Sequence, residues 1–341
     1  MARCVRRSNA YPGVAVRRPM LSRRTFVLAC AAAIARPHRG FAAEPLTLWG
    51  PPAAPSIVLA QAVASGALRE IDAASVFRTW RTPDEMRAGL ASRTMQIVIV
   101  PSSVAANLYN RVLGVRLLNI MTRGLLYIVG NEEIGRIEHL AGKKISVPFR
   151  NDMPDYVLQR LLTRAGLKVG KDVQFEYAGT PPEAMQLLLA GRVDAALLAE
   201  PAATAAILRA KVGLKWFTRA IDCQKEWAEV VGGSAFIPQA GLVVTQPFIE
   251  RVGRKGLETL QNAVREAVDY TLNHPLWASA AAATEMGLLS PIVAEAIPHS
   301  NLVALPASSI RPDLEKFFSI LAEDDPRIIG GKLPGDSFYA L

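Results

Sequence analysis

From Pro45 onward, short apolar segments with strand character alternate with segments of helical character, many of which begin at proline or serine. This alternation predicts an α/β protein, because strands that alternate with helices form parallel or mixed sheets whose faces the helices cover. The pattern falls into two series, one before and one after about Gly130. We therefore expect two lobes of like construction.

The two series predict the following elements. In the first, strands are expected at 46–49, 75–80, 96–100, 117–121 and 125–129, and helices at 56–67, 83–91 and after Pro101. In the second, strands are expected at 144–147, 173–177, 193–198 and 214–218, and helices at 154–165, 182–190 and 201–210. A returning strand at 241–245 precedes expected helices at 257–272, 275–286, 291–296 and 312–321. We expect lobe I at 44–130 plus 238–341 and lobe II at 131–237.

An internal similarity supports two lobes of like topology. Residues 83–93 align with residues 182–192, with proline, methionine, leucine, alanine and arginine matching at a constant offset of 99. Each segment is expected to form a helix and a tight turn that lead into an apolar strand. Equivalent positions in two successive series favour a repeated unit over a chance match.

Residues 1–43 have the features of an export signal. Ser22-Arg23-Arg24-Thr25-Phe26 resembles a twin-arginine motif, and the apolar run 26–35 that overlaps it is too short to cross a membrane as a helix. Small residues follow, so we expect cleavage near Ala42-Ala43 and a periplasmic mature protein. The twin-arginine and general export routes both stay open, and Met20 is an alternative start.

The charge of the mature part bears on one class of function, nucleic-acid binding. Nine of the 39 basic residues lie in residues 1–43, which contain no acid, so the remaining 30 basic and 30 acidic residues balance. A balanced chain gives no support to nucleic-acid binding, which needs a basic surface. Cys223 is the only cysteine after residue 43, so no internal disulfide or cysteine metal site is expected.

Three segments carry a family resemblance. They are Leu140-Ala141-Gly142-Lys143-Lys144-Ile145-Ser146-Val147, the stretch 165–173, and Ala190-Gly191-Arg192-Val193-Asp194-Ala195 followed by Glu200-Pro201. In this order and spacing, the chain from about Leu46 to Thr245 resembles the nitrate/sulfonate/taurine/thiamine-precursor branch of ABC-transporter periplasmic solute-binding proteins. The first series departs from the pattern, because Ser92-Arg93-Thr94-Met95 stands where glycine and aspartate are usual.

The resemblance implies a two-lobed periplasmic-binding-protein fold of type II, with two parallel or mixed sheets flanked by helices and a helical C-terminal segment. It implies a monomer that binds a small molecule and delivers it to ABC permease and ATPase subunits, without enzymatic activity or a cofactor. The cysteine-rich motif of the fungal pyrimidine-synthesising relatives is absent. A sensor partner in place of an importer subunit stays open as an alternative.

Candidate ligand contacts follow from the position of strand ends. In open α/β sheets, ligands bind beyond the carboxyl ends of the strands, where helix N-termini offer N–H groups suited to anions. The candidates at these ends are Trp49, Pro51, Ser56, Ser102, Ser103, Thr122, Arg123, Phe149, Arg150, Asn151, Asp152, Thr180 and Glu200. Ser102 and Ser103 have capping as an equal alternative, and Trp227 is expected near the hinge, on the surface or in a lid.

The expected ligand is a small organic anion or zwitterion, such as a sulfonate or carboxylate. Helix N-termini and Arg150 favour an anionic head, and Trp49 and Phe149 favour an organic body over bare nitrate or bicarbonate. A thiamine-type pyrimidine is the alternative ligand, and an exported cofactor-dependent enzyme is the alternative function. His139, His274 and His299 are scattered along the chain, which offers no recognisable catalytic set.

Overall fold

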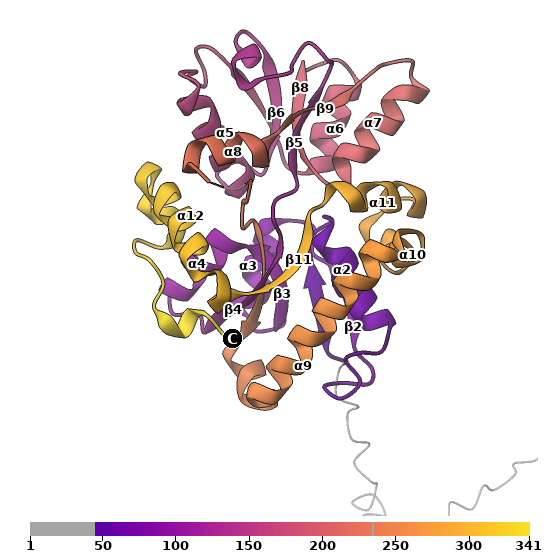
Figure 1. The fold of residues 1–341 in the computed structure, drawn as a ribbon, viewed down its shortest axis with the longest axis vertical. Helices are drawn as coiled ribbons and strands as arrows, with labels where there is room; N and C mark the ends of the chain where they lie inside the picture. The colour runs from indigo at the N-terminus through magenta and orange to yellow at the C-terminus, as the bar shows by residue number, and fades with distance from the viewer. Residues whose placement is uncertain (1–44, 234) are drawn as a thin grey trace, which may run out of the picture. The chain divides into compact units, whose positions relative to one another are not determined.

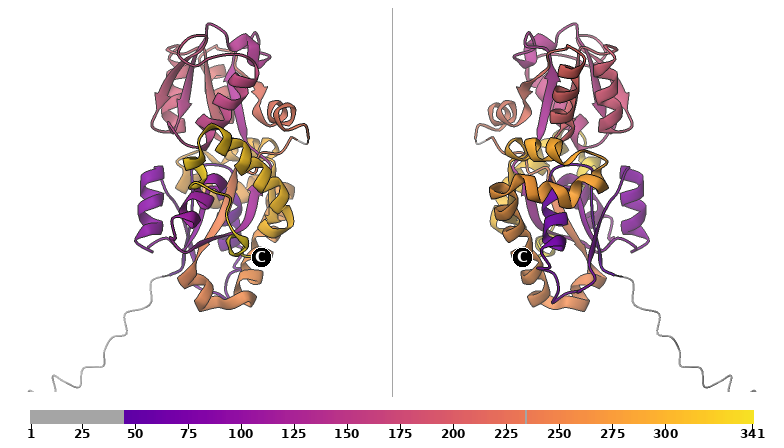
Figure 2. Two further views of the ribbon diagram at one scale, coloured as in Figure 1. Left: turned by 90° about the vertical axis from the view of Figure 1, so that its left-hand side faces the viewer. Right: turned by 90° about the vertical axis from the view of Figure 1, so that its right-hand side faces the viewer.

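The computed structural model describes residues 45–233 and 235–341, and the predicted export signal lies outside these residues. Two β-sheets lie one above the other along the long axis of the described part, and helices cover both faces of each (Figures 1 and 2). Both sheets contain parallel and antiparallel pairs. The α/β fold with two helix-flanked sheets, which the sequence predicts, is confirmed.

The lower sheet of Figure 1 has six strands in the order β11-β4-β10-β3-β1-β2. Its strands are β1 (Thr47–Gly50), β2 (Val76–Thr79), β3 (Ile97–Pro101), β4 (Val115–Thr122), β10 (Ala240–Thr245) and β11 (Leu302–Pro306). β1 is parallel to both β2 and β3, whereas β10 is antiparallel to β3 and β4. The carboxyl ends of β1, β2 and β3 therefore meet at one edge of the sheet.

The upper sheet has five strands in the order β7-β6-β8-β5-β9. Its strands are β5 (Leu126–Gly130), β6 (Lys144–Pro148), β7 (Gln174–Ala178), β8 (Ala195–Ala199) and β9 (Thr218–Asp222). β6 is parallel to β7 and β8, and β5 is antiparallel to β8 and β9. The order repeats that of β2-β1-β3-β10-β4, so the two halves share one topology and β11 is an addition to the first.

The helices divide between the two halves. Those of the lower half are α2 (Pro55–Ala64), α3 (Pro83–Ala91), α4 (Ser102–Asn110), α9 (Gln246–Asn273), α10 (Pro275–Met286), α11 (Ser290–Ala296) and α12 (Arg311–Asp324). Those of the upper half are α5 (Met153–Arg164), α6 (Pro181–Leu189), α7 (Ala202–Val212) and α8 (Cys223–Val231). Short 3-10 turns are η1 (Ile137–Leu140), η2 (Ile297–His299), η3 (Ala307–Ile310), η4 (Pro326–Ile329) and η5 (Asp336–Phe338).

The internal repeat is present, but its register differs by one residue from the expected offset of 99. α3 and α6 both start at a proline after a capping threonine, Thr82 or Thr180, whose hydroxyl accepts a bond from the N–H of Glu85 or Glu183. These caps, and the strands β3 and β8 that follow, correspond at an offset of 98. The Pro181-Pro182 doublet allows two alignments in the sequence, and the cap selects one.

The chain passes between the halves earlier than expected. β5 pairs with β8 and β9 in the upper sheet, so the first crossing lies before Leu126 and not near Gly130. The reason is that β5 fills, in the upper sheet, the place that β10 fills in the lower one. The second crossing lies between α8 and β10, where the N–H of Ile237 donates to the carbonyl of Arg123 at 2.9 Å. The two crossings are therefore hydrogen-bonded to each other.

Three local predictions were wrong. The strand expected at 214–218 begins only at Thr218, because α7 continues to Val212 and a turn follows. β11 lies within a region expected to be helical, where it gains ladder bonds from β4 that no local pattern shows. Trp227, expected on the surface or in a lid, is a fully buried residue of α8 and packs edge-on against Phe317.

The apolar core has three clusters. One runs along both halves and includes Met86, Val98, Ile145 and Phe317, and the other two lie separately in the lower and upper halves. α12, in yellow in Figure 1, joins the halves: Arg160 of α5 pairs with Asp324 at 3.0 Å. Because one cluster and one helix are shared, the two halves are packed against each other.

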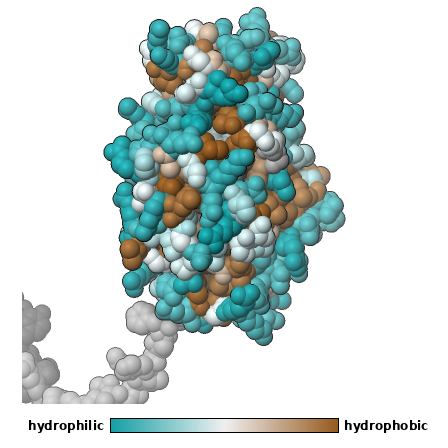
Figure 3. All heavy atoms as spheres, turned by 60° about the vertical axis from the view of Figure 1, so that its left-hand side comes forward, coloured by the Kyte–Doolittle hydropathy of each residue, from teal (hydrophilic) through white to brown (hydrophobic). Residues whose placement is uncertain are grey.

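Apolar side chains are scattered on the face drawn in Figure 3, where hydrophilic residues predominate. Among the described residues, no single helix is long and apolar enough to cross a membrane. α10 and α11 (with η2) pass the same test only as a pair, and they bend by 117° at their break. Several residues of both helices, including Ala282 and Val293, belong to the core of the lower half.

Candidate ligand-binding site

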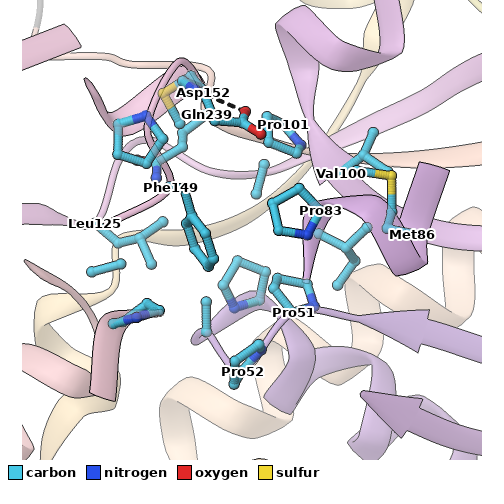
Figure 4. Close-up of a pocket in the computed structure, with 18 of the residues that line it drawn as sticks. Pro51, Pro52, Pro83, Met86, Val100, Pro101, Leu125, Phe149, Asp152 and Gln239 are labelled. Carbon is cyan, nitrogen blue, oxygen red and sulfur yellow. Dashed lines mark hydrogen bonds between the residues drawn. The ribbon is translucent and has the colours of Figure 1, made fainter. Parts of the chain in front are cut away.

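A cavity of about 80 Å³ lies between the two halves, at the carboxyl ends of their parallel strands (Figure 4). Its lining comes from both halves and is almost entirely apolar. The lining residues are Pro51, Pro52, Ala53, Pro55, Trp80, Pro83, Met86, Ile99, Val100, Pro101, Leu125, Phe149, Asp152, Met153, Pro154, Pro181, Ala199, Gln239 and Ala240. The position is the one expected for a ligand in an open α/β sheet.

Proline gives this cavity its chemical character. Pro55, Pro83 and Pro181 are the first residues of α2, α3 and α6, and Pro154 is the second residue of α5. Proline fits the first turn of a helix, where its fixed φ is favourable and its missing N–H is not needed. Four helices therefore present apolar rings at their N-terminal turns, where N–H groups would otherwise be available.

Most remaining donors at these helix ends are already bonded within the protein. Thr82 and Thr180 cap α3 and α6, as described above, and the N–H of Met153 donates to Asp152 Oδ1 at 2.8 Å. At α2, the N–H of Ala54 donates to the carbonyl of Glu200 at 2.9 Å. The helix termini, which the sequence analysis expected to offer N–H groups to an anion, are thus largely closed.

Among the described residues that line the cavity, Asp152 alone has an ionisable side chain, and this side chain is an acid. It is 5% exposed, and its Oδ2 accepts a bond from Nη2 of Arg87, on α3, at 2.9 Å. Burial raises the pKa of this carboxyl above its usual value, although the neighbouring Arg87 and the N–H of Met153 oppose the shift. Because Arg87 and Asp152 come from different halves, this ion pair also ties the halves together.

Gln239 is the second polar side chain of the lining. The residue is 7% exposed, and its Oε1 is buried without a hydrogen-bond partner in the described structure. Its backbone is fixed, because its N–H donates to Ile237 O at 2.7 Å and its carbonyl accepts from the N–H of Ser102 at 2.9 Å. A rigid backbone thus holds a polar side chain with free acceptor capacity at the cavity.

Phe149 reaches the cavity from an unusual backbone conformation. Phe149 and Asn151 have φ values of +59° and +58°, in the left-handed region that residues other than glycine seldom adopt. Figure 4 shows the Phe149 ring in the middle of the cavity, with Pro51 and Pro52 on one side and Asp152 and Gln239 on the other. Such local strain is concentrated at binding sites, where the surroundings hold it in place.

Of the predicted contacts, the structure brings together Pro51, Phe149 and Asp152 at the cavity. The predicted arginines lie elsewhere. Arg150 is exposed and stacks on Tyr177 at 4.9 Å from the ring centre, and Arg123 is exposed and lies 5.3 Å from the ring centre of Phe236. Neither guanidinium lines the cavity.

The predicted hydroxyl residues mostly bond to the backbone. Ser56 donates to Pro51 O, Ser102 donates to Pro238 O, and Thr122 donates to Ser300 O at 2.7 Å. None of the three lines the cavity. Ser56 can approach Pro51 because Gly50 leaves room: a Cβ at Gly50 would lie 2.2 Å from Ser56 Oγ. Thr180 caps α6 beside the cavity residue Pro181.

The other predicted residues have structural positions. Trp49 packs against the shared core cluster, and its indole N–H is buried without a partner in the described structure. Glu200 is fully buried and pairs with Arg219 at 2.6 Å, as well as accepting bonds from Thr204. Ser103 and Asn151 line a neighbouring groove and not the cavity.

That polar groove has a volume of about 500 Å³ and is lined from α3, α4, α5 and η4. Its charged residues are Arg87, Arg111, Asp152, Asp325 and Arg327. Asp152 lines both spaces, so the Arg87–Asp152 pair stands at the boundary between an apolar cavity and a polar groove. No group of three or more histidine, cysteine, aspartate or glutamate residues within 45–233 and 235–341 is placed to hold a metal ion.

Much of the lining was not predicted from the sequence, including Trp80, Pro83, Met86, Met153, Pro181 and Gln239. Two signals were available. The run 51–55 contains three prolines directly after a strand, and each expected helix near a strand end starts beside a proline. Trp80 lies at the carboxyl end of β2, and its indole N–H donates to Ile99 O at 3.0 Å. Gln239 had no local signal, because the second crossing positions it.

A two-lobed α/β protein with a cavity between its lobes has the architecture of a solute-binding protein. The family model described as "ABC transporter, phosphonate, periplasmic substrate-binding protein" matches residues 69–267. This match spans more than half of the chain, and the protein belongs to that family. The family consists of substrate-binding proteins and not of enzymes, and membership implies a ligand and a transporter as partners.

Solved structures agree with the fold. An ABC transporter protein from Parabacteroides distasonis is 21% identical with a TM-score of 0.70, over 86% of this chain and 98% of that chain. The periplasmic aliphatic sulphonate binding protein SsuA from Escherichia coli is 19% identical with a TM-score of 0.64, over 85% and 96%. The periplasmic nitrate-binding protein NrtA from Synechocystis is 11% identical with a TM-score of 0.58, over 74% and 70%.

These neighbours share the type II periplasmic-binding-protein fold and confirm the resemblance stated from the sequence. At these identities, the likeness concerns the fold alone. No curated protein matches the chain.

Proposed function

We propose that this protein captures a small organic molecule with a mainly apolar body in the cavity between its lobes and delivers it to an ABC importer. The apolar lining of the cavity carries this proposal. Ligand pockets gain most of their affinity from buried apolar surface, and a few polar groups orient the ligand. Here Asp152 and Gln239 are the polar side chains, and proline rings, Trp80, Met86 and Phe149 supply the apolar surface.

The matching family and the structural neighbours are named for phosphonate, aliphatic sulphonate and nitrate. A bare inorganic anion suits this cavity poorly, because anions need cations or free N–H groups and the helix ends here carry prolines and caps. The sulfonate or carboxylate ligand stays a prediction for which the lining offers little support. A thiamine-type pyrimidine is the second candidate, because a flat ring fits apolar walls and its amino group fits the acceptors.

Ligand entry requires the lobes to separate. We propose lobe I and lobe II as the halves that carry the six-stranded and the five-stranded sheet, with the crossings near 123–125 and 235–239 as the hinge. Contacts between the lobes that must break on opening include the Arg87–Asp152 pair and the bond from Tyr127 Oη to His299 O at 2.8 Å. Two connections on one side allow hinge closure around a ligand. Small-angle scattering should show compaction when ligand is added.

A thermal-shift screen tests the proposal. Purified mature protein is screened against organic sulfonates, phosphonates, carboxylates, amines and pyrimidines, with nitrate and phosphate as inorganic comparisons. A ligand at 100 times its Kd adds about 2.7 kcal/mol to the free energy of unfolding. We expect at least one of the organic classes to stabilise the protein and inorganic anions to have no effect.

Two variants that replace an alanine by phenylalanine test whether binding occurs in the cavity. Ala199 lines the cavity, so Ala199→Phe should fill it and abolish the shift, whereas Ala190→Phe at the exposed end of α6 should retain it. Stabilisation by inorganic anions alone, or a shift that survives in Ala199→Phe, would contradict the proposal.

A further inference from the structure

The polar side chains of the cavity carry two kinds of acceptor, the carboxylate of Asp152 and the amide oxygen of Gln239, whose Nε2 is a donor. Asp152 receives one bond from Arg87 and one from the N–H of Met153, whereas a carboxylate can accept about four. Gln239 Oε1 is buried and receives no bond in the described structure. A buried acceptor without a partner costs free energy, which a donor on a ligand would recover. The cavity therefore has acceptor capacity to spare at two side chains.

Both of these side chains line the cavity. Figure 4 shows Asp152 and Gln239 at the same end of the cavity, beyond the ring of Phe149 as seen from Pro51 and Pro52. They come from different segments, the N-cap of α5 and the second crossing. The cavity thus has a polar end that accepts hydrogen bonds and an apolar end formed by prolines.

The guanidinium groups of Arg87, Arg123 and Arg150 do not line the cavity. Arg87 Nη2 bonds to Asp152, but Arg87 lines the polar groove and not the cavity. Arg123 and Arg150 stack on aromatic rings at the surface. An anionic head placed at the polar end would meet the carboxylate of Asp152, and like charges at close range repel.

We infer that the ligand carries a nitrogen head that donates hydrogen bonds, of the amine, amidine or amino-heterocycle class, and that Asp152 and Gln239 accept from it. This inference rests on the proposed function and names the ligand class of that site. The head lies at the Asp152–Gln239 end, and the apolar body lies between Phe149 and the prolines. Asp152 is shared between the ligand and Arg87, so the same carboxylate binds the ligand and holds the lobes together.

Four probes with a similar six-membered ring test the inference by calorimetric titration: benzamidine, 4-aminopyrimidine, benzoate and benzenesulfonate. We expect benzamidine and 4-aminopyrimidine to bind and the two anions to bind at least tenfold more weakly. Benzamidine presents two N–H-bearing nitrogens in one plane, which suits two neighbouring acceptors. Tighter binding of benzoate or benzenesulfonate would overturn the inference.

Substitutions locate the head. Asp152→Asn and Asp152→Ser both keep a residue that caps α5 well, so either variant tests the carboxylate with the helix intact. Each should weaken benzamidine at least tenfold, and Gln239→Leu should weaken both nitrogen probes at least threefold. Asp269→Asn is the matched control, because Asp269 is exposed on α9 and does not line the cavity. Unchanged affinity in both Asp152 variants would overturn the inference.

The outcome separates this inference from the proposed function. If the anionic probes bind and Ala199→Phe abolishes their binding, the cavity binds organic ligands and only the nitrogen head is wrong. If the nitrogen probes bind equally well to Ala199→Phe, they bind outside the cavity and the inference is also wrong. If all four probes fail to bind, both the inference and the proposed site are wrong.

Discussion

The two halves of the molecule present corresponding helix ends to one cavity, but only one of them supplies an acid. The helix after the first strand of each sheet is α2 in the lower half and α5 in the upper half. α2 has Ala54 at its N-cap and no side-chain cap, whereas α5 has Asp152 there, with a capping bond to Met153. The repeated backbone forms the cavity, and one residue that is not repeated gives it polarity.

The apolar walls show the same division. Pro83 and Pro181 are equivalent first residues of α3 and α6, and Pro101 and Ala199 are equivalent last residues of β3 and β8. Both members of each pair line the cavity. At the ends of β2 and β7, in contrast, the residues at the offset of 98 are Trp80 and Ala178, and only Trp80 lines it. The two halves therefore contribute equivalent backbone positions to the cavity wall. The large indole of Trp80 and the charged carboxylate of Asp152 each come from one half alone.

The largest expected effect is the loss of the indole that only the lower half has. Trp80 is 3% exposed, and Trp80→Ala should lower the free energy of unfolding by about 3–5 kcal/mol because it leaves a cavity and an unpaired Ile99 carbonyl. Urea denaturation followed by circular dichroism measures this. Trp216→Ala is the control, since Trp216 is 70% exposed, and should change stability by less than about 0.5 kcal/mol. Similar values for the two variants would contradict this account.

The next effect concerns the pair that joins the unequal halves. Arg87→Gln leaves the buried Asp152 without its cation and should cost about 1–3 kcal/mol. Asp152→Asn in the same chain should recover much of this loss, because no buried charge is then left unpaired. Arg254→Gln, which breaks an exposed pair with Glu258, should cost less than about 0.5 kcal/mol. A double variant no more stable than Arg87→Gln would show that the pair does not act through charge.

Smaller effects are expected where the halves are alike. Thr82→Ala and Thr180→Ala each remove a cap with the same geometry, so each should cost about 1 kcal/mol. The serine variants at both positions should retain most of the stability, since serine caps as well as threonine. Urea denaturation of the four variants makes the comparison. A large cost at one threonine and none at the other would show that the repeat is not equivalent at this position.

The smallest effect is the pH dependence that Asp152 contributes. Burial raises the pKa of Asp152 in the folded protein above its value in the unfolded chain, so the folded state takes up this proton first as the pH falls. The charged Asp152 carboxylate therefore lowers the free energy of unfolding by its full amount above the folded pKa. This destabilisation disappears as the pH falls toward the unfolded pKa. The stability of the wild type relative to Asp152→Asn should increase as the pH is lowered from 7 to 4. A difference that does not change with pH would contradict the shift.

Local patterns in the sequence were enough to predict the architecture. Apolar runs of strand length, prolines at helix starts and glycines in turns specify elements without reference to the rest of the chain, and α3 and α10 begin and end where the sequence predicts them. The repeat predicts two halves of one topology. Its register was one residue out, because adjacent prolines at 181 and 182 give no preference until the bond from the Glu183 N–H to Thr180 is seen.

The sequence by itself determined the fold class, the repeated unit and the edge of the sheets where a cavity would lie, because these follow from short-range periodicity and from the geometry of parallel strands. Only the tertiary structure decided which side chains face that cavity. Arg150 is one residue from Phe149 and two from Pro148, yet the left-handed backbone at Phe149 directs the ring inward while Arg150 stacks on Tyr177. Gln239 reaches the site because a crossing between the halves is hydrogen-bonded to α4, 137 positions earlier in the chain at Ser102. Such contacts join residues far apart in the sequence, and no local pattern contains them.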